Sequence, residues 1–243
     1  MVTIQCKDKT FSNIQAILFD KNGTLEDSEV NLRNFAQKAA RIIDAQIPGI
    51  GEPLLMAFGV NGNVLDAAGL MAVASRRETE IAAAAYIAET GRGWIESLAI
   101  ARKSLNEADK YLSDSASPLF AGSLELLQKL SQAGLELGIL SAATTQEVNQ
   151  FVKVHQLSDY IKLSMGVDGN ISKPEPALFL NACEQLEVAA NTTLMVGDSV
   201  GDMQMARNAE AAGCIGITWI GKSDNVRGAD VIIDKLDDIQ VVD

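Results

Sequence analysis

The chain has 243 residues, of which 47% are hydrophobic, and its formal net charge is −12 at pH 7. This hydrophobic content excludes an intrinsically disordered chain and suffices for a large α/β domain, alone or with a smaller one. The negative charge argues against a nucleic-acid-binding protein, because phosphate backbones are held by clustered Lys and Arg.

Targeting and redox features indicate a cytoplasmic protein. The N-terminus lacks the order of a signal peptide, and no apolar run reaches the length of a membrane span. Cys6, Cys183 and Cys214 are widely spaced and odd in number, which is typical of reduced thiols. We therefore expect no membrane partner. His155 is the only histidine, so catalysis has to rest on carboxylates, hydroxyls and lysine.

The first predicted strand covers residues 14–19 and ends at Asp20, which a turn-forming Asn-Gly pair follows at 22–23. From about residue 31 to 112 the pattern is helical and contains no convincing strand. Helices are expected at residues 31–45, 65–74, 78–90 and 94–112. We predict an inserted all-helical domain at residues 28–115, with hinges at 24–28 and 113–118.

After this insert, strands and helices alternate. The predicted helices cover residues 124–130 and 176–186. The predicted strands cover residues 135–140, 193–196, 214–217 and 231–233. Such alternation predicts an α/β fold with a doubly wound, Rossmann-like parallel sheet. Its core domain would comprise residues 1–27 and 116–243.

Polar residues follow three of the predicted strands. Asp20, Ser141 and Asp198 should meet at the carboxyl edge of the sheet, where open parallel sheets bind ligands. Lys173 lies in a loop with the sequence SKPEP at 172–176. Carboxylates suit Mg²⁺, and a transferring phosphoryl group is stabilised by metal, hydroxyl and lysine together. The sequence therefore predicts a magnesium site beside a phosphate site.

Four stretches resemble the motifs of the haloacid dehalogenase superfamily, in the same order: DKNGTL at 20–25, Ser141, Lys173 and GDSVGD at 197–202. Each motif alone is a weak signal, but all four in context form a strong one. The resemblance covers nearly the whole chain, and the helical insert matches the family's cap domain. The layout resembles the phosphoglycolate-phosphatase-like subgroup. This implies a Mg²⁺-dependent phosphatase that hydrolyses a small phosphorylated metabolite through an aspartyl phosphate.

The resemblance also implies roles for the metal site. Asp20 attacks phosphorus as the nucleophile. The Asp20 and Asp198 carboxylates and the backbone carbonyl of Asn22 bind Mg²⁺, and Asp202 supports the metal directly or through another ligand.

Further residues are expected to bind the substrate. Ser141 and Lys173 would hold the transferring phosphoryl group, and Thr24 would shape the loop after the nucleophile.

Two arginines in the predicted insert have two interpretations. The sequence SRRE at 75–78 matches a capping box, which places Arg76 and Arg77 in the first turn of a helix. Helix N-termini attract anions, so both residues are candidates for a substrate carboxylate or second phosphate. In the alternative interpretation they are solvated, and Arg76 pairs with Glu80 one turn on.

Asn22 departs from the family pattern, which usually has aspartate two residues after the nucleophile. In the family this acid protonates the leaving oxygen and then activates water, but an amide cannot exchange a proton in that role. Loss of a positioned acid–base group lowers rates by about 10²- to 10⁴-fold. We expect Mg²⁺ and phosphate binding to persist while turnover is weak.

Other functions stay open at this stage. A low-turnover protein that binds or senses Mg²⁺ and phosphate is favoured by Asn22. A 2-haloacid dehalogenase also lacks the second acid, but it has no need of Asp198 and Asp202. A phosphonate-cleaving relative requires a lysine in the insert, and nothing marks one. A mutase relies on the acid that Asn22 replaces.

Overall fold

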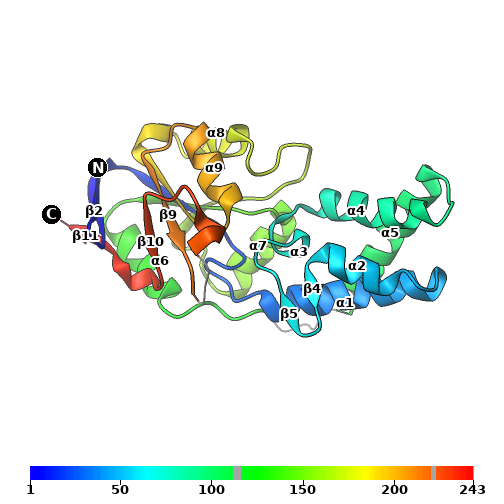
Figure 1. The fold of residues 1–243 in the computed structure, drawn as a ribbon. Helices are drawn as coiled ribbons and strands as arrows, with labels where there is room; N and C mark the ends of the chain where they lie inside the picture. Colours follow the sequence, from blue (N-terminus) through cyan, green and yellow to red (C-terminus); the bar gives the residue numbers. More distant parts are fainter. Residues whose placement is uncertain (112–115, 220–222, 243) are drawn as a thin grey trace. The chain divides into compact units, whose positions relative to one another are not determined.

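The computed structural model describes residues 1–111, 116–219 and 223–242. The chain forms two compact units (Figure 1). The first comprises Met1–Asp27 and Pro118–Asp243, and we call it the α/β unit. The second comprises Ser28–Ser117, and we call it the helical unit. Residues 113–115 of the expected second hinge lie outside the described residues.

The α/β unit contains a six-stranded sheet in the order β10-β9-β8-β3-β6-β7, with every pair of neighbours parallel. The strands are β3 (Ala16–Phe19), β6 (Glu136–Leu140), β7 (Ile161–Met165), β8 (Thr193–Gly197), β9 (Gly213–Ile217) and β10 (Val231–Ile233). The chain fills one side of β3 with β6 and β7 and then returns to the other side with β8. The predicted doubly wound parallel sheet is confirmed, and the strand order reverses beside β3.

Helices cover both faces of this sheet, which explains why its strands are apolar without alternation. Ile17 and Phe19 of β3 pack in one cluster with α6 (Ser123–Gln132) and α7 (Thr145–Val154). Leu18 points the other way and packs with α8 (Pro176–Gln185) and α9 (Val200–Asn208). Successive side chains of a strand alternate between faces, so one short strand supplies both cores.

The α/β unit also has a three-stranded antiparallel sheet in the order β11-β1-β2, which the sequence did not predict. Its strands are β1 (Val2–Cys6), β2 (Lys9–Ile14) and β11 (Ile239–Val242). The single strand expected at 14–19 is therefore wrong, because Ile14 ends β2 and Ala16 begins β3. Between them, the Gln15 N–H donates to the Thr192 carbonyl at 2.8 Å, so the chain changes sheets at a single polar residue between apolar ones.

The helical unit is built mainly from five helices: α1 (Glu29–Gln46), α2 (Gly51–Phe58), α3 (Leu70–Val73), α4 (Arg76–Glu89) and α5 (Trp94–Asp109). It also contains a hairpin of two-residue strands, β4 (Val60–Asn61) and β5 (Val64–Leu65). The helix expected at 65–74 is thus limited to α3. Helix α2 was not predicted, and it contains Pro53. Proline is tolerated in the first turn of a helix, where this residue lies.

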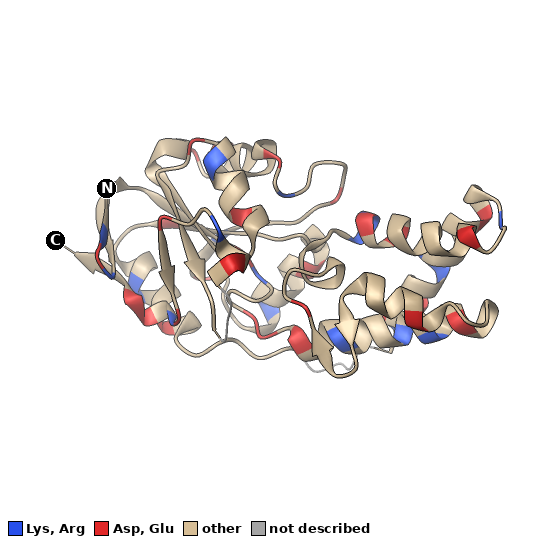
Figure 2. Cartoon of the chain, viewed as in Figure 1, with Lys and Arg blue, Asp and Glu red and all other residues tan. Residues whose placement is uncertain are grey.

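The core of the helical unit combines alanines with larger hydrophobic side chains. Seven alanines of α1, α4 and α5 are buried together: Ala36, Ala39, Ala40, Ala83, Ala84, Ala101 and Ala108. Larger residues such as Phe58 and Leu105 fill the remaining space. On the outside, Lys and Arg are interspersed with Asp and Glu along α1, α4 and α5 (Figure 2). Among the described residues, no helix combines the length and the apolar character that crossing a membrane requires.

Candidate active site

Polar residues follow three adjacent strands at the carboxyl edge of the parallel sheet. Asp20 follows β3, and its N–H donates to the Val196 carbonyl of β8 at 2.8 Å. Asp198 follows β8, and Phe19 is in register with Val196. Ser141 follows β6, and its N–H donates to the Met165 carbonyl at 3.0 Å. This edge lies where the strand order reverses, which is where open α/β sheets bind ligands.

Three carboxylates meet at this edge. One oxygen from each of Asp20, Asp198 and Asp202 lies within 4.8 Å of the others. Asp202 is fully buried in the first turn of α9. The Ser199 hydroxyl donates to Asp202 Oδ2 at 2.6 Å, and the Asp202 N–H donates to Ser199 Oγ at 3.2 Å. This capping box marks the start of α9 at Val200.

Lys173 joins two of these carboxylates. Its Nζ lies 2.6 Å from Asp20 Oδ1 and 2.6 Å from Asp202 Oδ1. The lysine side chain is 6% exposed, so both ion pairs are shielded from solvent. The Lys173–Pro174 peptide bond is cis. The expectation that this loop lysine approaches Asp20 agrees with the geometry, whereas its contact with Asp202 was not foreseen.

The charges of the cluster are incompletely balanced. Burial raises the pKa of Asp20 to about 6, although Lys173 opposes the shift. Burial, followed by the charges of Asp20 and Asp202, raises the pKa of Asp198 well above its usual value. Burial alone would lower the pKa of Lys173, but Asp20 and Asp202 outweigh it and raise the pKa instead. Three acids share one lysine, so the ionised cluster has an excess of negative charge.

The donor set fits a divalent cation. Hard cations such as Mg²⁺ are held by a few carboxylate and carbonyl oxygens, and this edge provides three carboxylates with unbalanced charge. Gly23 adopts a φ of +74°, and a Cβ at this position would overlap the Asp198 carboxylate. Glycine therefore lets the backbone after Asp20 approach Asp198 closely. Asp20, Asp198 and Asp202 are the residues that could hold such a cation.

The loop that follows Asp20 is an ordered turn. The Lys21 carbonyl accepts hydrogen bonds from the N–H groups of Leu25 and Glu26, and the Gly23 N–H donates to the Glu26 carbonyl at 2.9 Å. The Lys21 ammonium forms a buried ion pair with Glu26. Sequence reasoning missed this pair, although two opposite charges that flank a turn are a usable signal.

The remaining predicted residues of this site lie at the same edge. Thr24 is fully buried in the loop, and Asn22 is half-buried and forms a β-bridge with Glu26. Ser141 is 1% exposed, and its Oγ accepts a hydrogen bond from the Ala143 N–H at 3.2 Å. The structure thus brings the strand-end residues Asp20, Ser141 and Asp198 to one end of the sheet, and the loop residue Lys173 contacts Asp20 there.

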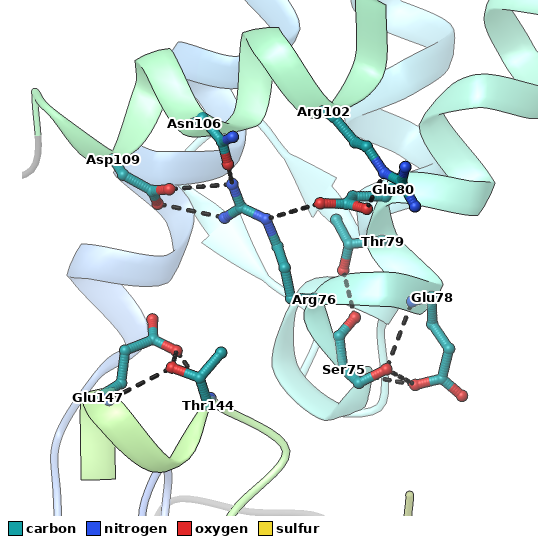
Figure 3. A network of polar contacts seen from close by, with 10 residues as sticks. All are labelled: Ser75, Arg76, Glu78, Thr79, Glu80, Arg102, Asn106, Asp109, Thr144 and Glu147. Carbon is teal, nitrogen blue, oxygen red and sulfur yellow. Dashed lines mark hydrogen bonds and ion pairs between the residues drawn. The ribbon is translucent and has the colours of Figure 1, made fainter. Parts of the chain in front are cut away.

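Arg76 belongs to a polar network of the helical unit (Figure 3). Its guanidinium donates to Asn106 Oδ1 at 2.8 Å and to Asp109 Oδ2 at 2.9 Å. It also lies 3.6 Å from Glu80, so the ion pair expected by the alternative interpretation is present.

The predicted capping box at the start of α4 is confirmed. The Ser75 side chain accepts a hydrogen bond from the Glu78 N–H, and the Glu78 carboxylate accepts one from the Ser75 N–H. Arg77, in the first turn of this helix, is exposed. A role of Arg76 and Arg77 in substrate binding stays a prediction.

Comparison with known proteins identifies the family. The model of the haloacid dehalogenase-like hydrolases matches residues 14–210. The chain belongs to this family. It is therefore a hydrolase of the class that its four motifs predicted. The chain is also 28% identical over 239 residues to a phosphoglycolate phosphatase of Pectobacterium atrosepticum, covering 93% of this chain and 91% of the relative.

Solved structures share the fold of this haloacid dehalogenase-like hydrolase. One is described as a predicted phosphoglycolate phosphatase from Haemophilus somnus, with a TM-score of 0.70, 18% identity, and coverage of 91% of this chain and 94% of that chain. Another is the β-phosphoglucomutase of Clostridium difficile, with a TM-score of 0.62, 18% identity and coverage of 91% of both chains. At these identities the likeness establishes the fold, and it supports the confirmed architecture.

Proposed function

We propose that the protein is a Mg²⁺-dependent phosphatase that hydrolyses a small phosphate monoester through an aspartyl phosphate on Asp20. The observation that carries the proposal is the cluster of Asp20, Asp198 and Asp202 around Lys173 at the reversal point of the sheet. The similarity to curated phosphoglycolate phosphatases makes phosphoglycolate the first substrate to try.

The proposed reaction begins at Asp20. One carboxylate oxygen forms a bond to phosphorus, and the bond between phosphorus and the leaving oxygen breaks. Lys173 orients Asp20 through its 2.6 Å contact and offsets negative charge as the phosphoryl group arrives. The Ser141 hydroxyl donates a hydrogen bond to a phosphoryl oxygen. A bound Mg²⁺, held by Asp20, Asp198, the Asn22 carbonyl and Asp202, would supply further charge neutralisation.

The second half of the reaction requires water to attack the aspartyl phosphate, which restores the Asp20 carboxylate and releases inorganic phosphate. Both halves benefit from a group that gives and takes a proton. Asn22 occupies the position of that group in related phosphatases and has no titratable proton. The leaving oxygen therefore takes its proton from solvent, and the attacking water loses its proton to solvent. Turnover is slow, with phosphoenzyme hydrolysis as the slower half.

A comparison with Asn22→Asp tests this proposal. Both proteins would be assayed with phosphoglycolate and a panel of other phosphate monoesters, with Mg²⁺ and with EDTA. We expect chelator-sensitive activity that rises by about 10²- to 10⁴-fold in Asn22→Asp. Equal rates would refute the role of Asn22, and activity that survives chelation would refute the metal requirement. Asp20→Asn, as a matched control, should abolish both activity and phosphoenzyme formation.

A second candidate is a binding or sensing protein that retains Mg²⁺ and phosphate affinity but turns over little. Asn22 is the observation that favours it. Intact-mass measurement separates the two functions, because a sensor would accumulate a stable phosphoenzyme of the native sequence. A hydrolase would also form the phosphoenzyme, but it would release phosphate over many turnovers and return to the unmodified mass once the substrate is used up.

We propose that the helical unit serves as the cap of this enzyme and limits the access of water and substrates to the site. We also propose a cytoplasmic location, with no nucleic-acid or membrane partner. The three cysteines are free and buried, which suits a reducing compartment.

A further inference from the structure

Trp219 touches the loop that follows the nucleophile. It lies just after β9, and its indole Nε1 donates a hydrogen bond to the backbone carbonyl of Gly23 at 3.0 Å. Gly23 is adjacent to Asn22, whose own carbonyl is a proposed metal ligand. A side chain distant in sequence thus holds the backbone at the edge of the carboxylate cluster.

The orientation of the indole is itself fixed. The Trp219 ring stacks on Phe120, with centroids 4.1 Å apart and an interplanar angle of 14°. The Phe120 N–H donates to the Leu25 carbonyl at 2.9 Å. The stacked pair therefore binds two carbonyls of the same loop, one through a side chain and one through the backbone.

The loop has little freedom to move without affecting the cluster. Gly23 lies so close to Asp198 that a Cβ would overlap its carboxylate. Rotation of the peptide after Gly23 would break the hydrogen bond from Trp219 and disturb the backbone that lies against Asp198. Partners of this kind, which orient a ligand without touching the metal, typically change metal affinity by about 10- to 100-fold when they are removed.

We propose that Trp219 is a positioning residue: its indole N–H fixes the Asn22–Gly23 backbone against Asp198 and raises the affinity of the site for Mg²⁺. The effect on affinity rests on the metal site of the proposed function. The effect on the loop does not require a metal.

Trp219→Phe tests the proposal because it removes the N–H and keeps an aromatic ring against Phe120. Without metal, hydrogen–deuterium exchange in the peptide covering residues 20–27 should be faster than in the native protein. Mg²⁺ binding, measured by titration calorimetry, should weaken by about 10-fold. Trp94→Phe, which changes the tryptophan of the helical unit, is the matched control and should alter neither quantity.

Each result has a defined meaning. Unchanged hydrogen–deuterium exchange in Trp219→Phe would overturn the positioning role of Trp219. Faster exchange with unchanged Mg²⁺ affinity would overturn its effect on metal binding. Failure of the native protein to bind Mg²⁺ would overturn both the effect on affinity and the cofactor of the proposed function. The exchange data would still decide whether Trp219 fixes the loop. If Trp219→Phe unfolds, Phe120→Leu offers a second route, since it keeps the N–H and loosens only the stacking. It should give a smaller change in the same direction.

Fluorescence provides an independent readout. In Trp94→Phe the only tryptophan emission comes from Trp219, and it should change on addition of Mg²⁺. In Trp219→Phe the remaining Trp94 emission should stay constant. If the fluorescence of Trp219 did not change at saturating Mg²⁺, the result would contradict a link between Trp219 and the metal-binding loop.

Discussion

The buried cores of the two units differ in residue composition. Among the described residues of the α/β unit, the buried cluster on one face of the parallel sheet has no alanine, and the cluster on the other face has three. The core of the helical unit includes seven alanines on three helices. Burial of a methyl group stabilises much less than burial of a leucine or isoleucine side chain. A core with a larger share of alanine therefore gains less stability from each buried residue.

The units also differ in how they treat charge. In the α/β unit, Asp20, Asp198 and Asp202 are crowded around one lysine, and desolvation raises the pKa of two of them. In the helical unit, Arg76 is matched by Asp109 and Glu80 with partial access to solvent. Uncompensated buried charge is unfavourable for stability, so its presence in one unit marks that unit as the functional one.

The sharpest contrast should come from alanine at two glycines with positive φ. Gly23→Ala adds a Cβ that overlaps Asp198, whereas Gly62→Ala in the helical unit finds nothing within 4 Å. Both substitutions add a backbone strain of about 1–2 kcal/mol. We expect Gly23→Ala to lose Mg²⁺ affinity by at least about 100-fold and Gly62→Ala to keep it. Calorimetric titration would measure this, and equal affinities would contradict the close approach of the loop.

Truncation of one buried phenylalanine in each unit should show whether the units open separately. Phe179→Ala and Phe58→Ala should each lower the free energy of unfolding by about 3–5 kcal/mol. All three cysteines lie in the α/β unit. Burial raises the pKa of Cys6 to about 12 and of Cys214 to about 11, so the native thiols stay protonated and unreactive at pH 8.

Thiol labelling of these variants is therefore a specific measure of the α/β unit. Phe179→Ala should label much faster than the native protein, and Phe58→Ala should label at nearly the native rate. Equal acceleration in both would show that the units unfold as one cooperative body.

The same capping motif occurs in both units, which permits a finer comparison. Ser75 and Ser199 each cap a helix, but only Ser199 also holds a carboxylate of the cluster, Asp202. Ser75→Ala and Ser199→Ala should each lower stability by about 1 kcal/mol. Only Ser199→Ala should also weaken Mg²⁺ binding, by about 10-fold. Chemical denaturation and calorimetry would separate these effects, and an equal loss of affinity in both would contradict the assignment.

The smallest expected effect concerns the two arginines. Arg76→Ala should lower stability by about 1 kcal/mol or less, because its ion pairs are partly exposed. Arg77→Ala should leave stability nearly unchanged. A rise in KM for either variant with the native melting temperature would instead support the substrate-binding role that the sequence suggested.

Local signals explain what the sequence predicted. Five strands of the parallel sheet are short apolar runs that end beside a polar residue, and β3, β6 and β8 lead to Asp20, Ser141 and Asp198. Their meeting point follows from parallel topology alone. The edge strand β7 was missed because only its first residue is fully buried, so its apolar pattern is weak.

Contacts between distant segments explain what was missed. The hydrogen bond from Trp219 to Gly23 and the contact of Lys173 with Asp202 join residues that share no periodic pattern. The change of sheet between β2 and β3 was not predicted because apolar residues lie on both sides of Gln15. Such features depend on packing in three dimensions, and periodicity along the chain does not report it.

One consequence concerns the place where the helical unit leaves the sheet domain. The Asp27 N–H donates to the Pro118 carbonyl at 2.9 Å, and Glu26 forms an antiparallel bridge with Leu119. The segments where the chain leaves and re-enters the α/β unit are therefore paired side by side. Because the two segments that flank the insert are held together within the α/β unit, the length and internal structure of the insert can vary without separating them. This makes the intervening segment an exchangeable module, through which evolution or an engineer could change specificity and leave the chemistry in place.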